Sequence, residues 1–369
     1  MNSPRCRAAG VILGALLSFL APHLSAEPAP VRLGATLPLS GNLASYGEQI
    51  RLGMELAAAD LLARGLKVEI VAEDTPMSGP VVISTLRKLM EGSKVQGIAG
   101  NFSNPAMLSM APLLRGAPLV AMHTAAMDDE ILAASGGWIF STNTRIRDEA
   151  KRLAHYAFET GARRAAIVTI ETSFGLAYRE HFKHAFEGLG GKIVADENYQ
   201  LGDTDYRAQL TKVRLAKPEI VFGATFGHFL GLTLRQAREL GITAPFISVY
   251  ESEDRSVLEA AGANANGLRY FTSYAPTAQG QAAEVRRRLA ERLKHAPSTF
   301  ALNAYDATVL LAEAVGQCSG RAPCVAETLR RVKDYDGVSG RLSIGADGAA
   351  ERSFYLNEVR DGKFVPVPE

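Results

Sequence analysis

The feature that most constrains the fold of this chain is a regular alternation of short apolar runs with stretches of helical period. Strictly alternating β and α segments predict an α/β fold, in which a parallel sheet is flanked by helices on both faces. The expected strands cover residues 31–37, 68–72, 95–99, 118–121, 165–170, 193–198, 220–224, 246–249 and 267–271. The expected helices cover residues 47–64, 81–91, 105–115, 148–160, 176–189, 206–216, 229–240, 282–294 and 301–316.

Chain length and a faint internal repeat predict two lobes. The 369 residues exceed what one hydrophobic core usually organises. Residues 94–122 and 217–249 share one plan: a strand, a Gly-containing turn with aromatic residues, a helix, a turn ending in Ala-Pro, and another strand. In each lobe the carboxyl ends of the strands would form the crevice where open α/β sheets bind ligands.

The first residues predict export. Arg5 and Arg7 precede an apolar run too short to span a bilayer comfortably, and small residues follow at Ser25 and Ala26. We therefore expect residues 1–26 to be a cleaved signal peptide and the mature chain to be a soluble periplasmic protein. An uncleaved anchor is the alternative. Cys6 lies before the apolar run rather than after it, which argues against a lipid-modified cysteine.

The charge balance gives no indication of a polyelectrolyte partner. The chain carries 40 Lys and Arg against 39 Asp and Glu. Removing residues 1–26 removes two arginines and no acid, which leaves 38 against 39 and a formal charge of −1. No basic run interleaves with aromatic residues, so a nucleic-acid partner is not expected.

Two cysteines remain beyond the leader, in the segment VGQCSGRAPCVAETL. In an oxidising compartment Cys318 and Cys324 predict a disulfide across a helix-to-helix loop. A redox or metal role is the alternative, but the spacing is not C-x-x-C and no histidine is near.

The segment GNFSNPAML places polar residues at a helix start. Asn104 is expected as the N-cap and Pro105 as the first helical residue. A helix N-terminus that follows an apolar strand and a glycine presents free backbone N–H groups to the crevice, which suits a carboxylate. The alternative is an ordinary helix start.

The segment LPLSGNLASYGEQ is a strand-to-helix turn without a phosphate-loop pattern, since neither GxxxxGK[ST] nor GxGxxG is present. A bulky ring in such a turn either packs under the loop or lines the crevice, and the turn alone leaves both positions open for Tyr46.

No catalytic motif is evident, and no metal or cofactor is expected. GxSxG and HExxH are absent, and the close pair His181 and His184 lies among charged residues that indicate a solvated helix face rather than a metal site. Aromatic residues instead recur beyond the predicted strands or at a helix start, which indicates an apolar-walled pocket between the lobes. They are Tyr46, Phe102, Phe174, Phe226, Tyr250 and Phe300.

Over nearly its whole mature length the chain resembles the solute-binding proteins of ABC importers related to the leucine/isoleucine/valine-binding protein. The resemblance rests on the order and spacing of VRLGATLPLSGNLASYGEQIRLGMELAAADL, GIAGNFSNPAML, APLVAMHTAA, GDTDYRAQL, KPEIVFGATFG and YDGVSGRLSIGADG. It implies two Rossmann-like lobes, joined by a three-strand hinge, that close on a ligand (the type I periplasmic binding fold). The implied lobes are residues 27–143 with 275–342, and residues 144–274 with 343–369.

In the first lobe the resemblance implies two contacts before the fourth strand. Tyr46 matches a ring that covers the ligand. Asn104 stands where amino-acid binders usually have a serine that holds the ligand carboxylate, with Phe102 and Ser103 beside it.

A third first-lobe segment would receive both carboxylate and ammonium through backbone and hydroxyl groups. It corresponds here to Thr124, Ala125 and Ala126, and the family threonine at the last of these positions is an alanine.

In the second lobe Phe174 and Phe226 stand where tyrosines often close over the ligand, and the acidic partner of the ligand ammonium aligns with Tyr250 or Glu251. Phe300 matches an aromatic residue near the side-chain pocket. If Glu251 faces the ligand, a branched-chain or aromatic amino acid is expected. If Tyr250 does, an aromatic or aliphatic carboxylate or an amide is favoured.

The leading hypothesis is a monomeric periplasmic binding protein that delivers an amino-acid-like or small apolar carboxylate ligand to an ABC permease. A ligand sensor or envelope assembly partner that uses the same lobe closure is the first alternative. An enzyme on this scaffold is the second, since fold does not fix function.

Overall fold

The computed structural model describes residues 29–75, 79–116, 119–274 and 279–368. The predicted signal peptide lies outside these ranges. Within them no helix combines the length and the apolar character that a bilayer crossing requires.

The first sheet is parallel throughout, with strand order β2-β1-β3-β4-β5. The order reverses direction at β1, so β1 and β3 flank a topological switch point. β1 reads as a nearly continuous apolar run because both of its faces are covered. The strands are β1 (Val31–Leu37), β2 (Val68–Asp74), β3 (Gly97–Asn101), β4 (Ala121–His123) and β5 (Ile139–Ser141).

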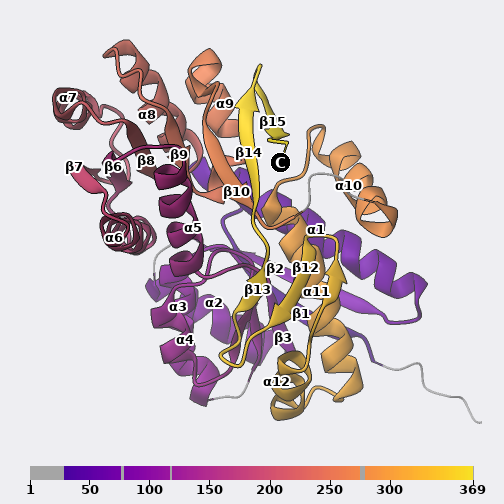
Figure 1. Ribbon diagram of the computed structural model, residues 1–369. Helices are drawn as coiled ribbons and strands as arrows, with labels where there is room; N and C mark the ends of the chain where they lie inside the picture. Colours follow the sequence, from indigo (N-terminus) through magenta and orange to yellow (C-terminus); the bar gives the residue numbers. More distant parts are fainter. Residues whose placement is uncertain (1–28, 76–78, 117–118, 275–278, 369) are drawn as a thin grey trace, which may run out of the picture.

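Helices from both ends of the chain cover the first sheet (Figure 1). α11 is buried on nearly all sides and contacts α1, β1 and β3, which explains why its sequence is apolar all round. We call this sheet with its helices the first lobe. The helices are α1 (Ala44–Ala63), α2 (Gly79–Arg87), α3 (Asn104–Gly116), α4 (Asp129–Ser135), α10 (Gly280–Leu293), α11 (Thr299–Gln317) and α12 (Ala322–Arg330).

The second sheet has the order β15-β14-β10-β9-β8-β6-β7 and, with α5–α9, forms what we call the second lobe. The strands from β6 to β10 pair in parallel. They are β6 (Arg164–Ile170), β7 (Lys192–Tyr199), β8 (Ile220–Ala224), β9 (Phe246–Ser248) and β10 (Arg269–Thr272). The helices are α5 (Ile146–Glu159), α6 (Ser173–Gly188), α7 (Arg207–Ala216), α8 (Gly227–Glu239) and α9 (Arg255–Ala261).

The end of the chain departs from the predicted alternation. β14 (Tyr355–Arg360) and β15 (Lys363–Pro366) form an antiparallel hairpin at the edge of the second sheet. Asp361 and Gly362 both have positive φ, as a two-residue hairpin turn of this kind requires. No helix fits between two strands so close in sequence, so they cannot run parallel.

The chain passes between the lobes three times: after β5, after β10, and between β13 (Ala350–Arg352) and β14 (Figure 1). β13 belongs to a small antiparallel sheet with β11 (Tyr335–Gly337) and β12 (Gly340–Ile344). The buried guanidinium of Arg352 donates hydrogen bonds to Thr142 O and to the oxygens of Asn303 and Ser339. One side chain therefore ties two of the crossings to α11.

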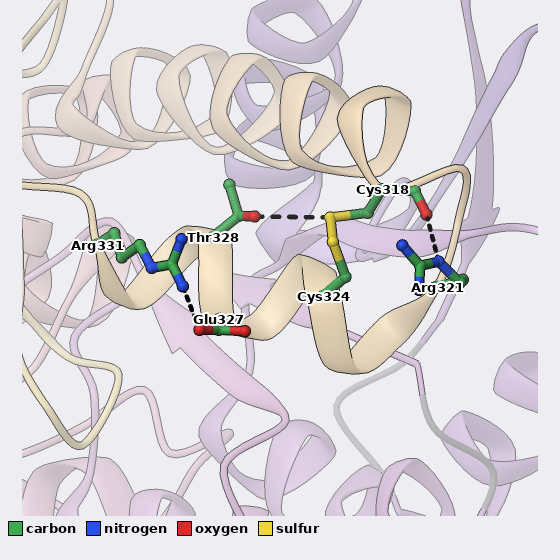
Figure 2. Close-up of a disulfide and its surroundings, with 6 residues drawn as sticks. All are labelled: Cys318, Arg321, Cys324, Glu327, Thr328 and Arg331. Carbon is green, nitrogen blue, oxygen red and sulfur yellow. Dashed lines mark hydrogen bonds and ion pairs between the residues drawn. A yellow bond between two sulfur atoms is a disulfide. The ribbon is translucent and has the colours of Figure 1, made fainter.

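The close-up in Figure 2 shows the disulfide between Cys318, at the end of α11, and Cys324, in α12. The pairing and its place between two helices are those predicted from the sequence. Arg321 in the intervening loop donates to Cys318 O.

Replacement of both cysteines by serine should lower the free energy of unfolding. Opening a loop of this short sequence separation increases the entropy of the unfolded chain and stabilises the unfolded state by about 2 kcal/mol. Urea unfolding of wild type and Cys318→Ser/Cys324→Ser, each with and without reductant, measures the difference. Wild type should lose stability with reductant and the double variant should not. Equal stability of oxidised wild type and variant would contradict a structural role.

Candidate functional site

Loops at the carboxyl ends of strands from both lobes meet around a cluster of aromatic rings. Tyr46 stacks on Phe102 with centroids 4.8 Å apart, and Phe102 meets the ring of Phe226 from the second lobe at 6.4 Å. Phe226 continues to Phe174 at 5.5 Å. Phe300 lies 5.0 Å from Tyr46. The aromatic residues singled out in the sequence therefore form one contiguous group between the lobes.

A small cavity of about 120 Å³ lies beside this cluster, between the lobes. Its lining is mostly apolar and includes one carboxyl side chain. The lining residues are Phe102, Ser103, Asn104, Pro105, Ala125, Thr172, Phe174, Leu201, Phe226 and Glu251.

Five of the predicted site residues lie outside this lining. The rings of Tyr46, Tyr250 and Phe300 pack in the aromatic group behind it. Thr124 and Ala126 make hydrogen bonds within the protein, which are described below.

Three lining residues were not predicted: Pro105, Thr172 and Leu201. Thr172 follows β6 and caps α6, so the strand-end rule that selected Phe174 also applies to it. Leu201 follows β7 and is 48% exposed, and no local signal distinguishes it.

The start of α3 differs by one residue from the prediction. Ser103, rather than Asn104, is the N-cap, because its Oγ accepts the Ala106 N–H at 3.2 Å. Asn104 is then the first helical residue and Pro105 the second. The serine hydroxyl reaches the N–H three residues ahead, as an N-cap does, and the Asn104 side chain is freed for another contact.

That contact is with His123, at the end of β4. Asn104 Oδ1 lies 2.7 Å from His123 Nε2, and the histidine has no exposed surface. When Nε2 carries the proton it donates to the Asn104 oxygen, which leaves the amide N–H2 group and one lone pair of that oxygen for other partners. Burial lowers the pKa of His123 to about 3, so the ring is neutral at physiological pH.

The segment after β4 uses its polar groups inside the protein. The Thr124 hydroxyl donates to Asn101 O at 2.7 Å. The Ala126 N–H donates to the Tyr250 hydroxyl, at 2.8 Å, across the gap between the lobes. A ligand in the cavity could therefore reach the lining residue Ala125 more readily than its two neighbours.

Of the two residues between which the sequence left a choice, Glu251 lines the cavity and Tyr250 does not. The Glu251 side chain is 2% exposed, and Oε2 has no hydrogen-bond partner among the described residues. Burial, and then the nearby charge of Glu149, raise the pKa of Glu251 well above its usual value. An unpaired buried carboxyl group is costly unless a bound group satisfies it.

Direct hydrogen bonds also join the lobes beside the cavity. The Tyr46 hydroxyl donates to Glu251 O at 3.2 Å. Ser45 Oγ and Gln49 Nε2 donate to Asp254 Oδ2 at 3.2 and 3.4 Å. Within the first lobe, Gly47 lets α1 pack closely against the end of β1, since a Cβ there would lie 2.0 Å from Pro38 O.

Other features of the surface lack these properties. A larger cavity of about 610 Å³ borders α9, α10 and the β14–β15 hairpin, and none of the predicted site residues line it. Across the described ranges no three His, Cys, Asp or Glu side chains are grouped so as to hold a metal ion. His181 and His184 line a surface groove with Arg147 and Lys151.

Comparison with known proteins identifies the family. The model of the periplasmic binding protein family matches residues 30–363, so the chain belongs to this family of solute-binding proteins, which are not enzymes. It is 24% identical over 353 residues to Leu/Ile/Val-binding protein homolog 3 of Brucella melitensis, covering 92% of this chain and 94% of the relative.

Two solved structures show the same fold. One is the branched-chain amino acid transporter substrate binding protein LivJ from Streptococcus pneumoniae in complex with isoleucine, with a TM-score of 0.84 and 23% identity over 92% of this chain and 99% of that one. The other is an ABC transporter solute binding protein from R. palustris in complex with benzoate, with a TM-score of 0.84 and 21% identity over 92% and 96% of the two chains.

The hydrogen bond of Tyr250 predicts an asymmetry between two tyrosine variants. Tyr250→Phe leaves the buried Ala126 N–H without an acceptor and should cost about 1–3 kcal/mol of unfolding free energy. The buried Tyr270 hydroxyl has no partner among the described residues, so Tyr270→Phe should be neutral or stabilising. Urea unfolding compares the two, and equal losses would refute the assignment.

His123 predicts a pH dependence of stability. Its folded-state pKa of about 3 lies below the ordinary 6.5, so below pH 6.5 the unfolded chain binds an extra proton. The free energy of unfolding should therefore be retained above pH 6.5 and fall by up to about 1.4 kcal/mol per pH unit, from this group, between pH 6.5 and 3.

His123→Gln keeps an N–H donor for Asn104 but removes the titrating ring, so its stability should fall less steeply with acid than that of wild type. Urea unfolding at pH 7.5, 5.5 and 4.5 tests this, with the exposed His184→Gln as control. Parallel profiles for wild type and His123→Gln would show that His123 is not the group responsible.

Proposed function

We propose that this chain is the periplasmic solute-binding subunit of an ABC importer, and that it captures an amino acid with a small apolar side chain between its lobes. The signal peptide predicted at residues 1–26, the family assignment and the amino-acid-binding relatives support this proposal. The mature protein would act as a monomer and deliver its ligand to a membrane permease.

The observation that carries the proposal is the unpaired Oε2 of Glu251 in a mostly apolar cavity. A ligand ammonium beside it would satisfy Oε2 and favour its charged form. The same cavity includes Ser103 and Asn104, at the N-terminus of α3. The helix dipole and the backbone N–H of Asn104 there favour a carboxylate, while the Ala106 N–H is already bonded to Ser103. One cavity thus offers complementary groups for both ends of a zwitterion.

The other residues of the cavity lining favour a ligand with a small apolar side chain. Phe102, Phe174 and Phe226 supply an apolar wall, and the cavity is small compared with the 300–1,000 Å³ typical of drug-sized ligands. Aliphatic side chains such as those of valine or leucine match this environment better than polar or bulky ones.

An aromatic carboxylate is the second candidate ligand. The raised pKa of Glu251 allows it to stay protonated and to donate a hydrogen bond to an oxygen of the ligand. The similarity to the benzoate-bound protein from R. palustris supports this alternative.

The proposed mechanism is closure of two lobes, residues 27–143 with 275–342 and residues 144–274 with 343–369. The two main sheets draw their strands from these ranges, but the third crossing follows β13 (Ala350–Arg352), beyond the proposed junction at residue 342, because β12 and β13 stay paired before it. Groups at Asn104 would meet the ligand first, and Phe174, Phe226 and Glu251 would complete the enclosure. The ligand stabilises closure only if it binds the closed form more tightly.

Calorimetric titration of the mature chain with leucine, isoleucine, valine and benzoate tests the proposal. We expect one of the amino acids to bind, and Glu251→Gln to weaken it by about a hundredfold or more, since removal of one partner of a buried ion pair costs about 3 kcal/mol or more. Glu253→Gln, at a partly buried glutamate outside the cavity lining, is the matched control and should leave affinity unchanged.

Benzoate binding that survives Glu251→Gln would favour the second candidate. Absence of binding by both classes would contradict the proposed ligand.

A further inference from the structure

A second buried carboxyl group lies directly behind the ligand cavity. Glu149, in the first turn of α5, is 1% exposed and is not part of the cavity lining. Its Oε1 accepts the Tyr250 N–H at 2.9 Å, and its Oε2 accepts the Tyr178 O–H at 2.6 Å. Glu149 therefore holds the turn that carries Glu251 (Tyr250–Ser252), and α6 supports it through Tyr178.

The two carboxyl groups differ in their hydrogen bonds. Glu149 receives a donor on each of its oxygens, which stabilises its charged form. Glu251 Oε2 receives none among the described residues, and hydrogen bonds from the Tyr250 side chain and the Glu251 backbone only partly offset the rise in the pKa of Glu251. Two neighbouring carboxylates in a dry interior do not readily ionise together, and they titrate as a pair. Above about pH 7 the donors therefore assign the negative charge to Glu149 and the proton to Glu251.

Tyrosine side chains, rather than cationic ones, surround the two carboxyl groups within the described residues. The titratable neighbours are Tyr178 from α6, Tyr250 beside Glu251, and Tyr46 from α1, which also lies near Asp254. Within the described residues, the electrostatic neighbours of the two carboxyl groups include no cationic side chain. Burial raises the pKa of Glu149 to about 7, and burial together with the charge of Glu149 raises the pKa of Glu251 well above its usual value.

We propose that Glu149 is a positioning residue of the ligand site, and that Glu149 and Glu251 share one proton when the site is empty and release it when a cationic head group binds. The inference rests on the ammonium ligand proposed above. In the balanced step, the Glu251 carboxyl loses its proton to solvent and the carboxylate pairs with the ligand ammonium. No other bond changes.

Proton release makes ligand affinity depend on pH. While Glu251 is protonated in the free protein, each unit of falling pH should weaken binding of an amino acid by up to about tenfold, as for one linked proton. Loss of the Glu149 charge should let Glu251 ionise at lower pH. Near pH 7.5, where Glu149 is mostly charged, the Glu149→Gln variant should then bind more tightly than wild type, whereas a purely structural role predicts weaker binding.

Calorimetry with leucine at pH 7.5, 8.0 and 8.5, where Glu149 is charged, in two buffers of different ionisation enthalpy, measures both affinity and protons released. Wild type should release close to one proton at pH 7.5, and Glu149→Gln fewer, with up to about tenfold tighter binding at that pH. Tyr178→Phe removes only one donor to Glu149 and should shift the profile in the same direction by less. Glu253→Gln is the control and should match wild type.

The ligand-free protein supplies an independent measurement. The infrared band of protonated carboxyl groups, followed with pH, should lose a component in Glu251→Gln, and that component should titrate at lower pH in Glu149→Gln and Tyr178→Phe. If leucine fails to bind but the band behaves this way, the ligand assignment is wrong and the carboxyl pair stands. If the Glu251 component is absent at pH 6.5, or Glu149→Gln leaves it unchanged, the shared proton is refuted.

Discussion

The contact of Tyr46 and Phe102 in the first lobe with Phe226 in the second is the interaction on which the rest of the site depends. Each ring follows the carboxyl end of a parallel strand, β1, β3 or β8, and so lies at the edge of its sheet where such folds bind ligands. Because the two edges face each other, burial of these rings and formation of the cavity are one event. The position of Glu251 after β9 follows from the same topology.

Much of the α/β fold could be predicted because each strand and helix follows from a local pattern of apolar residues. Alternating apolar runs predicted the parallel strands, and β1 begins and ends at the predicted residues. The C-terminal hairpin was missed although Asp361-Gly362 is a strong turn signal, since the expectation of continued β/α alternation left no place for it. Short strands such as β5 carry too few residues to show a period.

The sequence predicted the aromatic residues between the lobes but not the residues that hold them in place. Aromatic residues at strand ends identified the group between the lobes, but the choice between Tyr250 and Glu251 depends on how one turn is held. That turn is fixed by Glu149, about a hundred residues earlier in the chain, and no sequence pattern links the two. His123 is a similar case, since its role as partner of Asn104 exists only once β4 lies beside β3. The N-cap of α3 was predicted one residue too late, at Asn104 instead of Ser103, because serine and asparagine are both good N-cap residues.

The hydrogen bond from Ala126 to the Tyr250 hydroxyl, with those from Ser45, Tyr46 and Gln49, joins the lobes through the protein's own atoms. When the two lobes of a binding protein already attract each other, the empty protein is closed for part of the time. Apparent affinity is reduced by the fraction of molecules that are in the binding-competent state, so a larger closed fraction makes this reduction smaller for a ligand that binds the closed form. Such preorganisation strengthens capture of a ligand present at low concentration. It also reduces the difference in closed population between the ligand-bound and the ligand-free protein. A partner that recognises the closed shape must then discriminate between two forms that differ less.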